Sequence, residues 1–228
     1  MKLFRHLPNT LTCGNLLCGC FGIVFCLEQR SIPAAYFVWG AGVFDFLDGF
    51  AARWLKTSSP IGKELDSLAD MVSFGVLPAL VMYKMINLTS DNPYLPYVAF
   101  FIAVCSALRL AVFNVDETQH DAFKGLNTPA NTIFITALPF LSGAIGSFVQ
   151  QAWVLIVITL LFSLLLVSRI DIIAFKFKDF SWINNKARFT FLACAVLLLL
   201  IFGKIALPFI ILLYIAFSLV ANGLKLNG

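Results

Sequence analysis

Long apolar stretches make up most of the chain, and short polar segments separate them. A helix that crosses the hydrocarbon core of a bilayer needs about 20 apolar residues, and each stretch is close to that length. The pattern therefore predicts an all-α fold, a polytopic membrane helix bundle with about eight transmembrane helices. The apolar windows fall near residues 8–28, 32–55, 63–87, 94–114, 128–148, 151–168, 187–203 and 205–223.

The composition favours lipid as the main solvent. Hydrophobic residues are 60% of the chain and charged residues only 12%, whereas soluble domains are about one quarter charged. A soluble fold of this size needs a polar exterior that the chain cannot supply. Helices of this number and length leave no room for a sizeable soluble domain within 228 residues. We therefore expect one integral membrane domain over residues 1–228.

Basic residues gather on one side of the predicted bundle. With the N-terminus inside, thirteen of the sixteen Lys and Arg residues fall on the cytoplasmic side, as the positive-inside rule requires. Both termini and the loops near 53–63, 115–127 and 169–188 are then expected to be cytoplasmic, in a multi-pass protein of the cell membrane. The formal charge of +4 suits anionic lipid headgroups. Nucleic acid is not an expected partner, because no soluble basic domain is predicted.

Four aspartates interrupt the second and third apolar windows. An aspartate at the centre of a membrane helix costs about 2.5–3.5 kcal/mol, so ionisable residues there indicate function. Asp45 and Asp48 are three residues apart, and Asp66 and Asp70 are four apart, so each pair shares a helix face. A short loop joins the two windows, which makes the helices antiparallel and the pairs similar in depth. All four carboxylates are therefore predicted to converge on one pocket.

Converging carboxylates repel one another unless cations lie between them. Oxygen ligands favour Mg²⁺, Mn²⁺ or Ca²⁺ over zinc, and two such ions could clamp a diphosphate. Gly49 and Ala52 leave room for a ligand beside the aspartates, and Gly62 allows a backbone to approach phosphate closely. The guanidinium of Arg53 suits phosphate oxygens.

Intramembrane aspartates also serve transporters. A cation or proton transporter that uses them as its ion site is the hypothesis from a different class of protein. Transporters often contain inverted repeats and helices broken near the middle of the membrane. The sequence has no evident repeat, and the aspartates lie toward one side, so an enzyme is favoured.

The aspartates belong to a longer motif: Asp45-Phe-Leu-Asp48-Gly49-Phe-Ala-Ala52-Arg53, eight residues, Gly62, three residues, Asp66, three residues, Asp70. This motif resembles the signature of the CDP-alcohol phosphotransferases. The resemblance implies a six-helix membrane core with a cytoplasm-facing active site, and two divalent cations, Mg²⁺ or Mn²⁺, bound by the four aspartates. It also implies that Asp70 is the general base, and that Gly49, Ala52, Arg53 and Gly62 surround the cytidine diphosphate.

The first window is similar to the first helix of the same family, in which polar side chains meet the nucleotide. The resemblance rests on Pro8-Asn9, Thr12 and Asn15. Hydrogen bonding between helices is the alternative role for Thr12 and Asn15.

Two later segments, 107–115 and 123–130, are similar to membrane-bound bacterial phosphatidylserine synthases. Val112 and Asn127 depart from that pattern, where a basic residue and a proline are common. The resemblance covers a catalytic core of about residues 5–190 and leaves extra C-terminal helices at about 187–223. It implies a bacterial enzyme that transfers the phosphatidyl group of CDP-diacylglycerol to the hydroxyl of L-serine and releases CMP. Related membrane enzymes are often dimers, so a homodimer is an open expectation.

The acceptor site needs a cation, because serine carries a carboxylate as well as an amine. Arg109, Lys124 and Arg169 all lie on the predicted active-site side, and Asn114 could hold the amine or hydroxyl. The three cations could instead be topology or lipid anchors. Glycerol phosphate and inositol phosphate are the alternative acceptors. They would require a pocket with more basic residues, because each brings a phosphate. The motif contains no Ser, Cys or His nucleophile, which favours direct displacement over a covalent intermediate.

Overall fold

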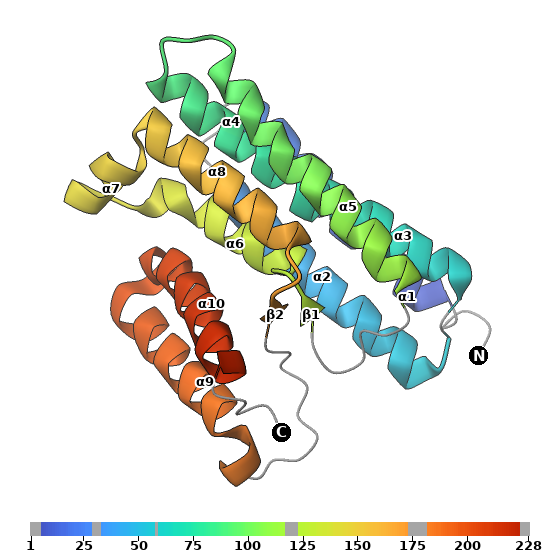
Figure 1. Cartoon of the computed structure of the whole chain (residues 1–228). Coiled ribbons are helices and arrows are strands. Elements are labelled where there is room, and N and C mark those ends of the chain that lie inside the picture. The colour runs from blue at the N-terminus through green and yellow to red at the C-terminus, as the bar shows by residue number, and fades with distance from the viewer. Residues whose placement is uncertain (1–5, 29–32, 58, 117–122, 173–181, 224–228) are drawn as a thin grey trace.

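Helices form nearly all of the described chain (Figure 1). The computed structural model describes residues 6–28, 33–57, 59–116, 123–172 and 182–223. In chain order the elements are α1 (Leu7–Leu27), α2 (Ala34–Leu55), α3 (Pro60–Asp70), the π-helix η2 (Met71–Val76), α4 (Leu77–Thr89), the 3₁₀-helix η3 (Leu95–Phe100), α5 (Phe101–Val115), β1 (Phe123–Lys124), α6 (Thr128–Ala137), η4 (Leu138–Phe140), α7 (Gly143–Val149), α8 (Ala152–Val167), β2 (Asp171–Ile172), α9 (Trp182–Phe202), η5 (Gly203–Ala206) and α10 (Leu207–Gly223).

The helices α2 and α3 both pack against α1, and α1 continues along η2. A β-carbon at Gly19 of α1 would overlap the Ser73 hydroxyl of η2. Glycine therefore allows the close approach of α1 to the helix that carries Asp66 and Asp70.

The π-helix η2 interrupts the continuous helix Pro60–Thr89 directly after Asp70. Pro78 has no N–H and cannot donate an α-helical hydrogen bond to the carbonyl of Phe74. The Thr132 hydroxyl of α6 donates to that carbonyl instead, at 2.8 Å. Single-turn π segments are frequent at functional sites, and this one lies just beyond the last aspartate of the motif.

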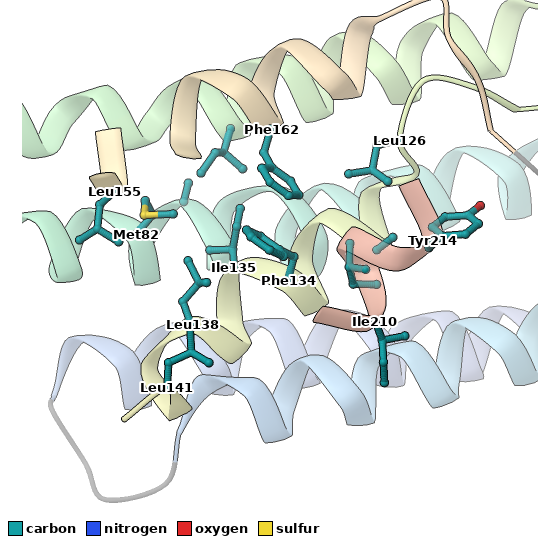
Figure 2. Packing of buried hydrophobic residues seen from close by; sticks show 14 of the residues in the cluster. Met82, Leu126, Phe134, Ile135, Leu138, Leu141, Leu155, Phe162, Ile210 and Tyr214 are labelled. Atoms are coloured by element: carbon teal, nitrogen blue, oxygen red, sulfur yellow. The ribbon is translucent and has the colours of Figure 1, made fainter. Parts of the chain in front are cut away.

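The apolar core surrounds α6, with side chains from α4, α8 and α10 (Figure 2). The rings of Phe134 and Phe162 stack with their centroids 3.9 Å apart. Met82 and Ile135 are fully buried beside them. This packing ties the middle of the bundle together and holds α6 against the helices of the aspartate motif.

A two-residue strand pair joins the loop before α6 to the segment after α8. Lys124 lies opposite Asp171 in this antiparallel pair. Gly125 has a φ of +76°, and a β-carbon there would lie 2.6 Å from the Leu166 carbonyl oxygen. Only glycine combines this conformation with such a close approach, so Gly125 brings Lys124 next to the end of α8.

The last two helices form a hairpin that lies beside α6 (Figure 1). The ring of Phe191 in α9 is 5.7 Å from the ring of Tyr214 in α10. Residues so far apart in sequence could not meet within one straight helix, so the chain folds back at η5. The last two apolar windows are therefore separate helices.

The predicted all-α membrane bundle is confirmed, but eight spans are not. Within the described residues, four helical segments are long and apolar enough to cross a membrane, and a fifth is added if the pair 128–140 and 143–149, bent by 119°, counts as one span. The helix α2 carries two aspartates and an arginine, and α8 has only 16 residues. The four segments are Leu7–Leu27, Pro60–Thr89, Leu95–Val115 and Arg188–Val220, and the last of these contains the fold-back at η5. Both chain termini lie outside the described residues, and the single domain and its core boundaries stay predictions.

Candidate active site

Three of the four motif aspartates form one group. Asp45 and Asp48 come from α2 and Asp66 from α3, and one carboxylate oxygen of each lies within 4.8 Å of the others. Asp48 is buried, and the other two are partly buried. The helical spacing within α2 and the antiparallel approach of α3 place these charges together.

The group is a suitable cation site by its own chemistry. The donors are all carboxylate oxygens, which hard divalent cations prefer. One buried oxygen, Asp66 Oδ1, has no hydrogen-bond partner among the described residues, and the carboxyl groups of Asp45 and Asp66 meet at hydrogen-bonding distance. Three carboxylates so close together would repel one another without a cation. The residues present therefore fit a divalent metal.

The first helix supplies a hydrogen bond to this group. Thr12 Oγ1 lies 2.6 Å from Asp48 Oδ2 and donates to it, and it also lies 3.0 Å from the Pro8 carbonyl oxygen. Hydrogen bonds to charged acceptors are short and strong. The contact fixes the orientation of Asp48 from a helix outside the aspartate motif.

Asp70 is held separately from the other three. It is outside the group of three carboxylates that lie within 4.8 Å of one another. Its Oδ1 accepts a hydrogen bond from Asn15 Nδ2 at 3.0 Å, and the Ser73 hydroxyl donates to the Asn15 backbone oxygen at 3.0 Å. Electrostatic interactions still connect Asp70 with Asp45, Asp48 and Asp66. The predicted role of Asp70 as a metal ligand stays a prediction.

Four of the predicted nucleotide residues line one cavity of about 240 Å³ between α1, α2 and α3. These residues are Thr12, Gly49, Ala52 and Gly62. Asp48 and Asp66 lie in the same wall, so the cavity borders the carboxylate group.

Two predicted nucleotide residues lie outside the lining of this cavity. Asn15 is fully buried and contacts Asp70. Arg53 is exposed in the last turn of α2. Asn15 belongs to α1 and is directed at Asp70.

Further polar residues line the same cavity without having been predicted. Thr57 Oγ1 is buried and has no hydrogen-bond partner among the described residues. Ser59 Oγ accepts a hydrogen bond from the Gly62 amide at 3.0 Å and so caps α3. The Ser59-Pro60 pair is a typical helix-start pattern that could have indicated this position. Lys63 adds a positive charge to the wall.

Three of the four predicted acceptor residues line a second cavity of about 530 Å³. Arg109 comes from α5, Lys124 from β1 and Arg169 from the segment after α8. Asp116 joins them, with its Oδ2 4.0 Å from Lys124 Nζ. The Nε atom of Arg109 is buried and has no hydrogen-bond partner among the described residues. The cavity thus combines three cations with one carboxylate.

Asn114, the fourth predicted acceptor residue, points elsewhere. Its Nδ2 donates to Ser67 Oγ at 2.8 Å, and its backbone oxygen accepts from Lys63 Nζ at 2.6 Å. Both partners belong to α3, so Asn114 ties α5 to the helix of the aspartate motif. It lies outside the lining of the second cavity.

A third, mostly apolar cavity adjoins Asp45. It has a volume of about 430 Å³ and is lined by residues of α2, η2 and α6, including Val38, Phe46, Phe74 and Ile133. A ligand with a polar group at the carboxylates could therefore place an apolar part in this cavity.

The fold and the site define a helical membrane protein that combines a group of three carboxylates, suited to a cation, with adjoining polar and apolar cavities. The family model of CDP-alcohol phosphatidyltransferases matches residues 5–165. The chain belongs to the CDP-alcohol phosphatidyltransferase family, and it is a membrane protein.

Three similar proteins share the name CDP-diacylglycerol–serine O-phosphatidyltransferase. The protein of Bacillus subtilis is 34% identical over 140 residues, which cover 60% of this chain and 76% of that protein. The protein of Mycobacterium bovis is 39% identical over 139 residues, or 58% of this chain and 48% of the relative. The protein of Mycobacterium leprae is 36% identical over 172 residues, or 72% and 57%. The match thus spans about half the length of the mycobacterial relatives.

Proposed function

We propose that the chain transfers the phosphatidyl group of CDP-diacylglycerol to the hydroxyl of L-serine and releases CMP. The observation that carries the choice of serine is the 530 Å³ cavity, in which Arg109, Lys124 and Arg169 lie together with Asp116. Asp116 gives this cavity a partner for an ammonium group, which serine carries and glycerol phosphate and inositol phosphate lack. The names of the relatives support the same acceptor.

The lipid substrate would lie across the carboxylate group. Asp45, Asp48 and Asp66 would hold divalent cations, Mg²⁺ or Mn²⁺, with Asp70 as a predicted further ligand. When bound, such ions neutralise diphosphate charge and stabilise the leaving oxygen. The cytidine would occupy the 240 Å³ cavity at Gly49, and one acyl chain would follow the apolar cavity beside Asp45.

The chemical step is a direct displacement at phosphorus. Asp70 takes the proton of the serine hydroxyl, the serine oxygen forms a bond to the lipid-side phosphorus, and the bond from that phosphorus to CMP breaks. The position of Asp70 supports this division of roles, because it is buried outside the close group of three and is oriented by Asn15. Arg53 would act at the exposed edge of α2, where it could meet the departing phosphate.

Serine would bind through both of its charges. The guanidinium groups of Arg109 and Arg169 suit its carboxylate, and the carboxylate of Asp116 suits its ammonium group. Arg109 also interacts electrostatically with Asp70, the proposed base. The Lys63 and Ser67 contacts of Asn114 hold the two cavities next to each other.

The proposal includes the cellular location and the oligomeric state of the enzyme. The basic bias of the predicted loops supports a site on the cytoplasmic side of a bacterial cell membrane. A homodimer is proposed only by analogy with related membrane enzymes.

An acceptor assay tests the proposed function. Detergent-solubilised protein would be incubated with Mg²⁺ or Mn²⁺, CDP-diacylglycerol and one alcohol at a time, and CMP and the lipid product would be measured. We expect CMP release and phosphatidylserine with serine. Release with glycerol phosphate or inositol phosphate but not with serine would overturn the acceptor. Ion flux through vesicles that lack CDP-lipid, without CMP release for any alcohol, would favour the transporter hypothesis.

A further inference from the structure

Lys63 is the single cation in the lining of the 240 Å³ cavity among the residues that the structure describes. Asp48 and Asp66 lie in the same lining, so one positive and two negative side chains border the same space. Arg53, the cation that the motif predicts for phosphate, is exposed and lies outside this lining. A phosphate inside the cavity would therefore meet Lys63 and not Arg53.

Lys63 and Asp66 share one face of α3. They are three residues apart in this helix, so their side chains leave it on the same side. Asp66 belongs to the carboxylate group that suits a divalent cation. A phosphate bound to a cation at Asp66 would thus lie about one helical turn, or about 5 Å, from the position of Lys63 along the helix. The flexible four-carbon stem of a lysine can cover such a distance.

Three hydrogen bonds tie Lys63 to its surroundings. Its Nζ donates to the backbone oxygen of Asn114 in α5 at 2.6 Å. The Ser67 hydroxyl donates to the Lys63 backbone oxygen at 3.2 Å and accepts from Asn114 Nδ2 at 2.8 Å. Lys63 is therefore linked to α5 through its side chain and, by way of Ser67, through its backbone.

The cavity still has polar groups available for a ligand. An ammonium group carries three N–H donors, and the bond to the Asn114 carbonyl uses one of them without cancelling the charge. The Thr57 hydroxyl in the same lining is buried and has no hydrogen-bond partner among the described residues. Buried polar atoms normally have a partner, so a polar ligand in this cavity would satisfy a group that the protein leaves open.

We propose that Lys63 binds the phosphate of the cytidine nucleotide, with its ammonium group held by the Asn114 carbonyl, and so fixes the nucleotide end of the lipid substrate beside the carboxylate group. The inference rests on the proposed function, because it takes the 240 Å³ cavity as the nucleotide site. Its anchor lies in α5, where Val112 and Phe113 line the 530 Å³ cavity. The phosphate contact is thus attached to the helix that borders the proposed acceptor site.

Binding of CMP and of cytidine to the detergent-solubilised protein tests the proposal, because the two ligands differ only in the phosphate. With Mg²⁺ present, the wild type should bind CMP more tightly than cytidine. The change Lys63→Gln should weaken CMP binding about tenfold, as expected for the loss of one hydrogen bond from a charged group. It should leave the Kd of cytidine within about twofold. The change Lys63→Arg, which keeps the charge, should bring the Kd of CMP back to within about threefold of the wild type.

The matched control is Lys56→Gln. Lys56 is an exposed lysine between α2 and α3 and lies outside the cavity lining, so its loss removes the same charge without removing a phosphate contact. Both dissociation constants should stay within about twofold. An unchanged Kd for CMP in Lys63→Gln, or equal weakening of CMP and cytidine, would overturn the proposal. If Lys63→Gln does not fold, Lys63→Met is measured in its place by the same criteria.

The wild type separates this proposal from the proposed function. If the wild type binds neither CMP nor cytidine, the nucleotide site is absent and both proposals fail. If the wild type releases CMP in the acceptor assay but Lys63→Gln binds CMP as tightly as the wild type, only the role of Lys63 fails. Release with an alcohol other than serine changes the acceptor, and the comparison of CMP with cytidine still decides the role of Lys63.

Discussion

The carboxylate group and the acceptor cavity are built in different ways. The carboxylate group uses two consecutive helices, and its three residues fall within 45–66. The acceptor cavity draws Arg109, Lys124 and Arg169 from three separate segments that a strand pair and Gly125 bring together. Local helical spacing is therefore sufficient to form the proposed site for the diphosphate, whereas the proposed acceptor site depends on long-range packing. This division would let the acceptor change while the proposed site for the nucleotide lipid stays the same.

The largest effect on turnover is expected at Asp70, which lies outside the group of three carboxylates. The change Asp70→Asn should lower kcat by about 10²–10⁴-fold, because it removes a general base. Binding of Mn²⁺ should persist, since Asp45, Asp48 and Asp66 stay in place. Turnover would be measured as CMP release, with the exposed Glu64→Gln in the same helix as control. Activity of Asp70→Asn near that of the control would remove Asp70 from the base role.

A smaller effect is expected from the carboxylate of the acceptor cavity. The change Asp116→Asn should lower kcat/KM for serine by about tenfold to 100-fold, the range for losing a hydrogen bond to a charged group. The analogue 3-hydroxypropionate lacks the ammonium group, and its kcat/KM with the wild type should be much lower than that of serine. Asp116→Asn should hardly change this lower value.

The exposed Asp91→Asn at the far end of α4 is the control for this comparison. Equal losses for serine and 3-hydroxypropionate would mean that Asp116 supports the loop through its pair with Lys124 and does not recognise the amine.

The smallest expected effect concerns the support of the carboxylate group by α1. The change Thr12→Val removes the hydrogen bond to Asp48 and should raise the Mg²⁺ concentration for half-maximal activity by about threefold to tenfold. The change Thr10→Val is the matched control, because Thr10 is exposed on the same helix and bonds only to the His6 carbonyl in the described structure. Equal metal requirements in the two variants would show that Thr12 does not orient Asp48.

Helices and local motifs were predictable from the sequence because their spacing is short-range. The helical spacing of Asp45, Asp48 and Asp66 predicts the group that the structure forms. The hydrogen bond between Asp70 and the amide of Asn15 was not predictable in this way, because Asn15 lies in another helix. The role of Asp70 as a fourth metal ligand stays a prediction.

Tertiary contacts account for the remaining differences. The fold-back at η5 is evident only from the structure, in which the ring of Phe191 contacts the ring of Tyr214. The side chain of Asn114 was expected at the acceptor, but its amide donates to Ser67 of α3, and Lys63 of the same helix donates to its backbone oxygen. No periodicity in the sequence could have indicated these partners, because they are distant in the chain.

The most direct test of the account is binding of Mn²⁺ to the solubilised protein, followed by electron paramagnetic resonance. The account predicts that wild type and Glu64→Gln bind the ion and that Asp66→Asn binds it at least about tenfold more weakly, because one of three closely spaced carboxylates is lost. If Asp66→Asn bound Mn²⁺ as tightly as the wild type, the carboxylate group would not be the metal site.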